Sequence, residues 1–103
     1  MKVSFLDVAA QEFAEAREYY DNQRVGLGDE FALEVQQTIG RIVEHPSAWA
    51  PLSSRTRRCR MRRFPFGVIY QLRADQILIV AILHERRDPR SWRERLVSGG
   101  HTA

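Results

Sequence analysis

The sequence contains few of the residues that cross-link a chain or bind metal ions. Cys59 is the single cysteine among 103 residues, which excludes an internal disulfide and a cysteine-rich zinc site. The three histidines, His45, His84 and His101, have no spacing typical of metal ligands. We therefore expect no metal and no cofactor, and the lone cysteine is typical of a protein of the reducing cytoplasm.

Long apolar runs and leader-like segments are also missing. No stretch approaches the roughly 18 apolar residues that a membrane-spanning helix needs, and the start lacks the basic-then-apolar layout of a signal peptide. The glycines at 26 and 28 do not follow a strand as in a phosphate loop, and no serine occupies a nucleophile elbow. We expect a cytoplasmic protein without membrane contact and without metal or acyl-transfer chemistry.

Lysine is nearly absent, and charge is unevenly distributed. Lys2 stands beside 15 arginines. The residues before Arg55 include 4 basic and 9 acidic side chains, whereas those from Arg55 onward include 12 and 4, giving net charges of −5 and +8. A basic surface attracts phosphate backbones or acidic protein segments, and arginine binds either through forked hydrogen bonds. The composition does not choose between these partners.

The first half of the sequence predicts a helical hairpin. A stripe with helical spacing predicts a helix over residues 7–24, begun by Asp7 as N-cap. A second stripe predicts a helix over residues 27–44, because proline at 46 disfavours helical geometry in the residue before it. The glycines at 26 and 28 predict a tight turn between them. The two stripes consist of Ala9, Phe13, Ala16 and Tyr20, and of Phe31, Val35, Ile39 and Ile42.

The second half predicts strands. Residues 46–54 are expected to form a loop, in which Trp49 folds back onto the core. Strands are expected at residues 58–62, 68–72 and 77–83, the last buried on both faces, and a short helix at 90–96. With a strand at residues 2–5, the order is β-α-α-β-β-β: an α+β domain whose helical hairpin packs on a mostly antiparallel sheet. We expect one domain, residues 1–103, with an ordered core over about 2–96.

The strongest local feature is a run of arginines between residues 55 and 63. If Cys59 and Met61 face the helices, three arginines would lie on the opposite face of the sheet, about 6.6 Å apart. That spacing is comparable to the spacing of phosphates along a nucleic-acid strand. Alternatively, the charges only protect an edge strand from aggregation. The run consists of Arg55, Arg57, Arg58, Arg60, Arg62 and Arg63.

A second candidate segment, HERRDPRSW at residues 84–92, follows the last predicted strand. An RNA-cleaving site needs a base, an acid and cations for the phosphate. His84 or Glu85 could supply the proton transfer, and Arg62 and Arg87 the cations. A histidine at a strand end is also commonly just a polar terminus, and we expect Trp92 to pack in the core rather than to stack on a base.

Together these motifs resemble the ParE/RelE superfamily of toxins. The resemblance covers about residues 2–96 and rests on five features: the helical hairpin, GLG at 26–28 before Phe31, Pro46 after the second helix, RFPFGVIY at 63–70 and HERRDPRSW at 84–92. It implies a RelE/ParE-like fold and the toxin half of a type II toxin–antitoxin system. The implied partner is a cognate acidic antitoxin, whose partly disordered segment folds over the toxin.

Within the superfamily, RelE-like members cut messenger RNA in the ribosome and ParE-like members inhibit DNA gyrase. RelE-like nucleases usually place a tyrosine or further acid-base groups near the C-terminus, but the tyrosines here are at 19, 20 and 70. The RRDPxxW ending looks more ParE-like, so we favour gyrase inhibition, which is not enzymatic. A ribosome-dependent endoribonuclease is the alternative, and a basic nucleic-acid-binding module is the third interpretation.

These interpretations assign different roles to a few residues. If the protein is a nuclease, the expected catalytic residues are His84, Arg62 and Arg87. The residues expected to contact the antitoxin or the target are Arg58, Arg60, Arg62, Arg63, Arg86, Arg87 and Trp92.

Overall fold

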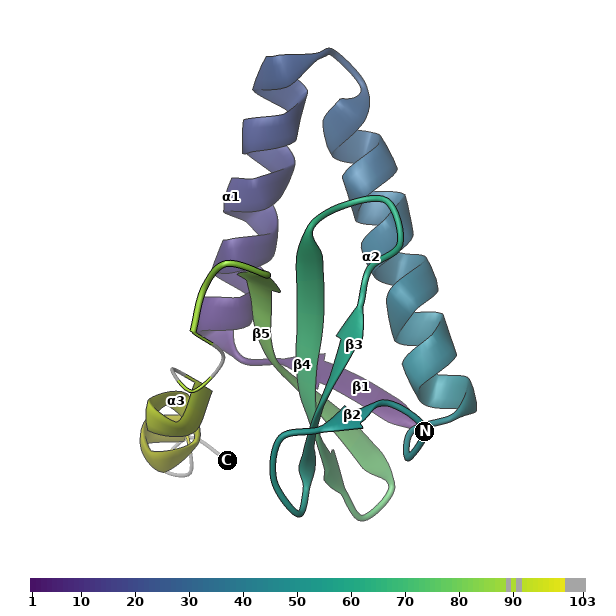
Figure 1. Ribbon diagram of the computed structural model, residues 1–103, viewed down its shortest axis with the longest axis vertical. Coiled ribbons are helices and arrows are strands. Elements are labelled where there is room, and N and C mark those ends of the chain that lie inside the picture. The colour runs from purple at the N-terminus through teal and green to yellow at the C-terminus, as the bar shows by residue number, and fades with distance from the viewer. Residues whose placement is uncertain (89, 91, 100–103) are drawn as a thin grey trace.

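The computed structural model describes residues 1–88, 90 and 92–99, and Figure 1 shows its helices and strands. The five strands form one sheet in the order β1-β5-β4-β3-β2, in which β1 runs parallel to β5 and the other pairs are antiparallel. The predicted α+β class, with a helical hairpin on a mostly antiparallel sheet, is confirmed. The elements are β1 (Lys2–Phe5), α1 (Asp7–Gln23), α2 (Leu27–Glu44), β2 (Ala50–Pro51), β3 (Thr56–Arg60), β4 (Phe66–Arg73), β5 (Gln76–His84) and α3 (Trp92–Gly99).

The arginine-rich strand lies two residues earlier than the sequence pattern predicts. β3 begins at Thr56, which pairs with Gln71 of β4, and it ends at Arg60. Beyond Arg60, the buried carboxylate of Glu34 accepts hydrogen bonds from the backbone N–H groups of Arg62 and Arg63. These two N–H groups are held by a side chain of α2 rather than by a strand ladder. Arg62 therefore does not continue the row formed by Arg58 and Arg60.

Two other expectations are also corrected. Residues 46–54, expected to be a loop, contain the two-residue strand β2 at the sheet edge. Proline, which lacks an N–H group, is tolerated at position 51 because an edge strand does not need every N–H group for the ladder. Asp7 is not the N-cap of α1: Leu6 holds that position, and Asp7 lies in the first turn, where its charge still favours the helix dipole.

The short C-terminal helix also differs in its bounds. α3 begins at Trp92 and ends at Gly99, rather than spanning residues 90–96. Residues 89 and 91, just before the helix, lie outside the described residues. Asp88 accepts hydrogen bonds from the backbone and guanidinium of Arg90, so its carboxylate organises the turn before the helix.

The hairpin turn depends on two glycines in different ways. Gly26 has a φ of 90°, a left-handed conformation that glycine adopts at little cost. Asp21 accepts hydrogen bonds from the N–H groups of Gly26 and Gly28, which fixes the start of α2 against the end of α1. At Gly28 the two helices approach so closely that a Cβ would lie 2.5 Å from the carbonyl oxygen of Arg17.

Replacing Gly28 with alanine is therefore expected to destabilise the protein by about 1–3 kcal/mol, because the helices must separate to admit a methyl group. Gly40, in the same helix, is the matched control: its Cβ would meet no described atom within 4 Å. Gly40→Ala should stabilise by about 0.5–1 kcal/mol through helix propensity. Urea denaturation of both variants measures the two effects. An unchanged midpoint for Gly28→Ala would show that the helices do not meet there.

The central strands β4 and β5 are buried on both faces of the sheet. On the hairpin side, Val68, Tyr70 and Ile79 pack with residues of α1 and α2, and Trp49 covers the edge of this core as expected. On the opposite side, Trp92 and Leu96 of α3 cover Ile69, Leu78, Val80 and Leu83. The predicted burial of β5 on both faces is therefore confirmed.

Tyr70 links the sheet to the end of α2. Its ring is fully buried, and its hydroxyl donates a hydrogen bond to the carbonyl of Pro46. Burial raises the pKa of Tyr70 to about 12. The folded state therefore keeps this proton at pH values where the unfolded state releases it.

Stability is accordingly expected to fall as the pH rises from about 10, the value for an unfolded tyrosine, to about 12. The Tyr70 contribution to the free energy of unfolding is complete below pH 10, and its loss reaches about 2–3 kcal/mol by pH 12. Denaturation titrations at several alkaline pH values measure this slope. Tyr70→Phe should flatten it, leaving a residual slope from Tyr20 and Cys59, whose pKa values burial also raises. The same slope in both proteins would refute the assignment.

Candidate functional site

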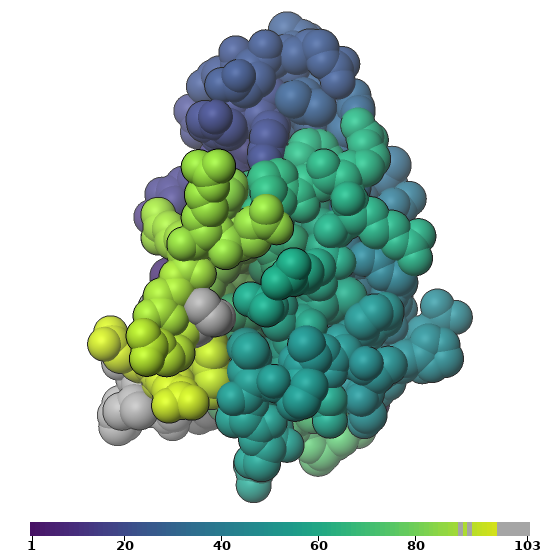
Figure 2. Space-filling view, viewed as in Figure 1, coloured from purple at the N-terminus to yellow at the C-terminus, as the bar shows by residue number. Residues whose placement is uncertain are grey.

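The face of β3 away from the hairpin carries arginines. Arg58 pairs in the ladder with Ile69, whose side chain belongs to the core under α3, so Arg58 lies on that face, with Arg60 two residues further on. Cys59 is buried in the core on the hairpin side. The predicted division of this strand into an apolar and a basic face is therefore correct for residues 58–60. Figure 2 shows this side of the molecule, where the yellow-green segment after β5 lies beside the teal and green strands.

Arg58 and Arg60 border a shallow hollow on this face. Its walls also include Arg87, His84 and Glu85, and its floor is formed by Gly67, Ile69 and Leu83. Gly67 permits this arrangement, because a Cβ there would lie 3.1 Å from the aliphatic carbons of Arg58. The Nε atom of Arg58 is buried and finds no hydrogen-bond acceptor in the part of the chain that the structure describes. We call the surface formed by Arg58, Arg60, His84 and Arg87 the arginine face.

The charges of the arginine face are not balanced within the molecule. Elsewhere, arginines pair with carboxylates, as Arg17 does with Asp29 and Arg95 with Glu12. Over residues 1–88, 90 and 92–99, no carboxylate pairs with Arg58, Arg60, Arg62, Arg86 or Arg87. Such unbalanced cations raise the local potential and attract anionic partners.

Two of the arginines in the run have structural partners, and Trp92 is buried. Arg57 donates a hydrogen bond to the carbonyl of Trp49 at 2.8 Å. Arg63 and Arg24 both bind Glu30, and their guanidinium groups hold the pKa of that carboxyl below its usual value. Trp92 is 5% exposed and lies in the core under α3. The side chain of Trp92 therefore packs in the core, as expected, and is not exposed for contact with a partner.

The predicted nuclease set is only partly assembled. His84 and Arg87 line the same hollow, but Arg62 lies in the turn after β3 and is not among the residues that border it. The Nδ1 atom of His84 accepts the N–H of Arg86 at 3.1 Å, so in the neutral ring the proton is on Nε2. Glu85 is exposed beside this ring. Tyr70, the tyrosine of the sheet, is buried on the opposite face.

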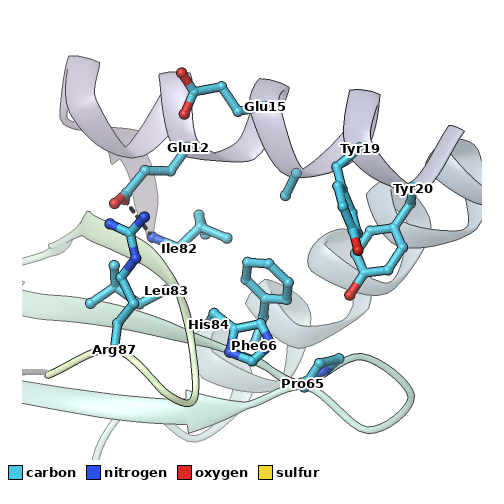
Figure 3. Close-up of a pocket in the computed structure, with 11 residues that line it drawn as sticks. Glu12, Glu15, Tyr19, Tyr20, Pro65, Phe66, Ile82, Leu83, His84 and Arg87 are labelled. Atoms are coloured by element: carbon cyan, nitrogen blue, oxygen red, sulfur yellow. Dashed lines mark hydrogen bonds between the residues drawn. The ribbon is translucent and has the colours of Figure 1, made fainter. Parts of the chain in front are cut away.

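A larger groove lies between α1 and the end of β5, and no pattern in the sequence predicted it. Its volume is about 480 Å³. In Figure 3, Tyr19 and Tyr20 point from α1 toward Phe66 and His84. The available signal was Tyr19, a large aromatic residue outside the predicted apolar stripe of Ala9, Phe13, Ala16 and Tyr20. We call this the tyrosine groove; it is lined by Glu12, Glu15, Ala16, Tyr19, Tyr20, Pro65, Phe66, Ile82, Leu83, His84 and Arg87.

An ion pair fixes α3 near one end of this groove. Arg95 donates to both carboxylate oxygens of Glu12, at 2.8 and 2.7 Å, and also to the carbonyl of Val80. Glu12 additionally accepts the N–H of Ile82 at 3.1 Å, the bond drawn in Figure 3. Both side chains are largely buried. This contact was not predicted, because its partners lie 83 residues apart in the sequence.

Two negative findings concern the described residues alone. No helix in this part of the chain is both long and apolar enough to cross a membrane. Within the same ranges, histidine, cysteine, aspartate and glutamate side chains do not gather into a group that could hold a metal ion.

Comparison with known proteins places the chain in a family. Residues 3–89 match the family model of the ParE toxin of the type II toxin–antitoxin system, parDE. A solved structure of the chromosomal ParDE toxin–antitoxin (TA) system from P. aeruginosa shares the fold with a TM-score of 0.58 and 22% identity, over 82% of this chain and 95% of that chain. No curated protein sequence matches significantly. Because the family model covers most of its length, the chain belongs to the ParE toxin family of type II toxin–antitoxin systems.

Proposed function

We propose that this ParE-family toxin inhibits growth by poisoning DNA gyrase and that a cognate acidic antitoxin neutralises it. The observation that carries the proposal is the arginine face, on which Arg58, Arg60 and Arg87 have no carboxylate partner among the described residues. Gyrase bound to DNA offers phosphates, and the antitoxin offers carboxylates. Forked arginine hydrogen bonds suit either group.

The same surface would explain neutralisation. An acidic segment lying on the arginine face removes the charges that the target needs, so antitoxin and target compete for it. A segment that becomes ordered only on binding loses conformational entropy, which weakens its affinity for a given contact area. When proteases degrade the free antitoxin, the bound antitoxin dissociates from the toxin and is not replaced.

The alternative, a ribosome-dependent messenger RNA endoribonuclease, is favoured by one observation. His84 and Arg87 line the same hollow as Arg58 and Arg60, so an imidazole lies among cations that would bind a phosphate. However, the expected third residue, Arg62, is not part of this hollow. The arrangement therefore favours binding of an anion over acid–base catalysis, because a complete acid–base pair is not assembled there.

Pulse incorporation of labelled thymidine and methionine, just after induction of this chain alone in bacteria, separates the two targets. We expect thymidine incorporation to fall first, and purified protein to inhibit supercoiling by purified gyrase. An early fall of methionine incorporation, with cleaved transcripts on translating ribosomes, would instead establish the nuclease. If neither label is affected and the protein only binds duplex DNA with a steep salt dependence, it is a nucleic-acid-binding module.

The role of the arginine face is tested with Arg58→Glu/Arg60→Glu. We expect the double variant to lose growth inhibition and to bind the acidic protein encoded beside the toxin at least about tenfold more weakly, because two attractive charges become repulsive. Arg55→Glu is the matched control, since it is exposed in the same arginine run but does not border the hollow. Equal effects of both variants would show that only net charge matters.

A further inference from the structure

The tyrosine groove presents a row of aromatic rings on the surface. The ring centroids of Tyr19 and Tyr20 are 5.3 Å apart, those of Tyr20 and Phe66 6.1 Å, and those of Phe66 and His84 5.2 Å. Tyr19 is 59% exposed, so its ring is available for contact with a partner. Partly exposed tyrosines around a hollow are typical of the central contacts of protein interfaces.

The wall formed by Ala16 gives this groove its depth. Ala16 is nearly buried and lines the groove together with Phe66 and Leu83, and its side chain is the smallest of the lining residues. The volume of about 480 Å³ is within the range of pockets that bind small ligands. The groove is thus apolar in its middle and open to solvent above.

Charge is distributed unevenly along the groove. Glu12 is engaged by Arg95 and by the N–H of Ile82, so its charge is already compensated. On the sheet side, Arg87 has no carboxylate partner among the described residues. His84 and Arg87 line both this groove and the hollow of the arginine face. A chain bound along the arginine face therefore reaches the groove without leaving the surface.

We propose that the acidic segment that neutralises the arginine face anchors itself in the tyrosine groove with a large apolar side chain. This inference rests on the proposed function and adds a second element to partner recognition. Carboxylates of the segment bind Arg87 and Arg60, while the apolar side chain packs against Tyr19, Tyr20 and Phe66. Charge provides attraction at a distance, and the anchor provides specificity.

A nucleic-acid strand fits this groove less well. An unstacked base could lie against the rings, but the helical wall carries the carboxylates of Glu12 and Glu15. The side chain of Glu15 is exposed, and the partner that the structure gives it is the neutral Gln11. Each base brings its own phosphate close to Glu15, whereas the uncharged anchor of a peptide can enter the groove while the carboxylates of the segment stay at Arg60 and Arg87.

Two short synthetic peptides test the proposal. Both consist of glutamate and serine, and one carries a central leucine where the other carries alanine. We expect the leucine peptide to bind the folded toxin about tenfold more tightly, since an apolar anchor at an interface commonly contributes that much. Isothermal titration calorimetry at fixed salt concentration measures both affinities. Equal affinities would overturn the inference.

Variants locate the anchor. Tyr19→Ala should abolish the difference between the two peptides, and because Tyr19 is exposed the variant is expected to keep its fold. Leu33→Ala is the matched control, since Leu33 is 54% exposed and borders a different groove, on the outer side of the hairpin. Persistence of the difference in Tyr19→Ala, or its loss in Leu33→Ala, would place the anchor elsewhere and overturn the proposal.

The proposed function and this inference can fail separately. If Arg58→Glu/Arg60→Glu weakens both peptides but Tyr19→Ala changes neither, the arginine face stands and the groove proposal is wrong. If neither variant changes peptide affinity, neither the arginine face nor the groove binds the acidic segment, while the gyrase target is still tested by label incorporation and supercoiling. A single-stranded oligonucleotide is titrated in parallel. If Tyr19→Ala weakens only that ligand, the groove binds bases rather than a peptide.

Discussion

Phe31→Ala should lower the free energy of unfolding by about 3–5 kcal/mol, the usual cost of removing a buried aromatic ring. Phe31 is fully buried and lies at the centre of an aromatic cluster between α1, α2 and the β3–β4 turn. Its ring centroid lies 5.2–6.1 Å from those of four others, Phe13, Tyr20, Phe64 and Phe66. Equilibrium denaturation in urea, followed by circular dichroism, measures the loss.

Two controls separate the cavity from general effects of mutation. Phe31→Leu keeps most of the volume and should cost clearly less than the alanine variant. Leu33→Ala, two residues away on the exposed side of α2, should change stability by no more than about 0.5 kcal/mol. A loss below about 1 kcal/mol in Phe31→Ala would contradict the cluster. Because Tyr20 and Phe66 also line the tyrosine groove, the alanine variant is further expected to lose the preference for the leucine peptide.

Glu12→Ala should cost about 3–5 kcal/mol, since removing one partner of a buried ion pair leaves the other charge uncompensated. The side chains of Glu12 and Arg95 are 15% and 17% exposed. Without Glu12, both the guanidinium of Arg95 and the N–H of Ile82 lose their acceptor. We expect α3 to separate from the sheet before the rest unfolds, because without the ion pair it is held mainly by the packing of Trp92 and Leu96.

The measurement is a double-mutant cycle with Glu12→Ala, Arg95→Ala and the combined variant. The expected coupling energy is large, because the double variant should be less destabilised than the two single costs predict together. Trp92 fluorescence reports the separation of α3, since the indole is buried when the helix is docked. Additive costs with unchanged fluorescence would show that the pair neither stabilises the fold nor holds α3. Arg17→Ala, which breaks an exposed pair with Asp29, should cost less than about 1 kcal/mol.

Local patterns predicted the elements but not all of their partners. The helical stripes gave the hairpin because each buries one face against its neighbour, as Phe31 and Val35 do. Alternation around Cys59 gave the two faces of β3, and seven consecutive apolar residues gave the burial of β5 on both sides. These features depend on residues a few positions apart in the sequence, and a periodic pattern of apolar residues is therefore enough to predict them.

Contacts between distant residues left no such pattern. The turn after β3 depends on Glu34, a residue of α2, so the expected alignment of Arg62 with Arg58 and Arg60 was wrong. The tyrosine groove combines Tyr19 of α1 with Phe66 of β4 and His84 of β5, and no segment alone indicates it. The site was predicted only as two groups of residues that are each close in the sequence, one around Arg58 and Arg60 and the other with His84 and Arg87.

The position of β1 has a consequence for synthesis of the chain. β1 precedes the other strands in the chain, but it lies at the sheet edge and pairs with β5. Lys2 can therefore pair with Gln76, and Glu12 with Arg95, only after these later residues have been synthesised. During translation the hairpin can form early, whereas the sheet closes only when the last strand has left the ribosome. Arg58 and Arg60 meet Arg87 at that same late step. Completion of the arginine face therefore depends on the synthesis of β5 and of Arg87 after it, and a ribosome that stalls before β5 yields a hairpin with an incomplete arginine face.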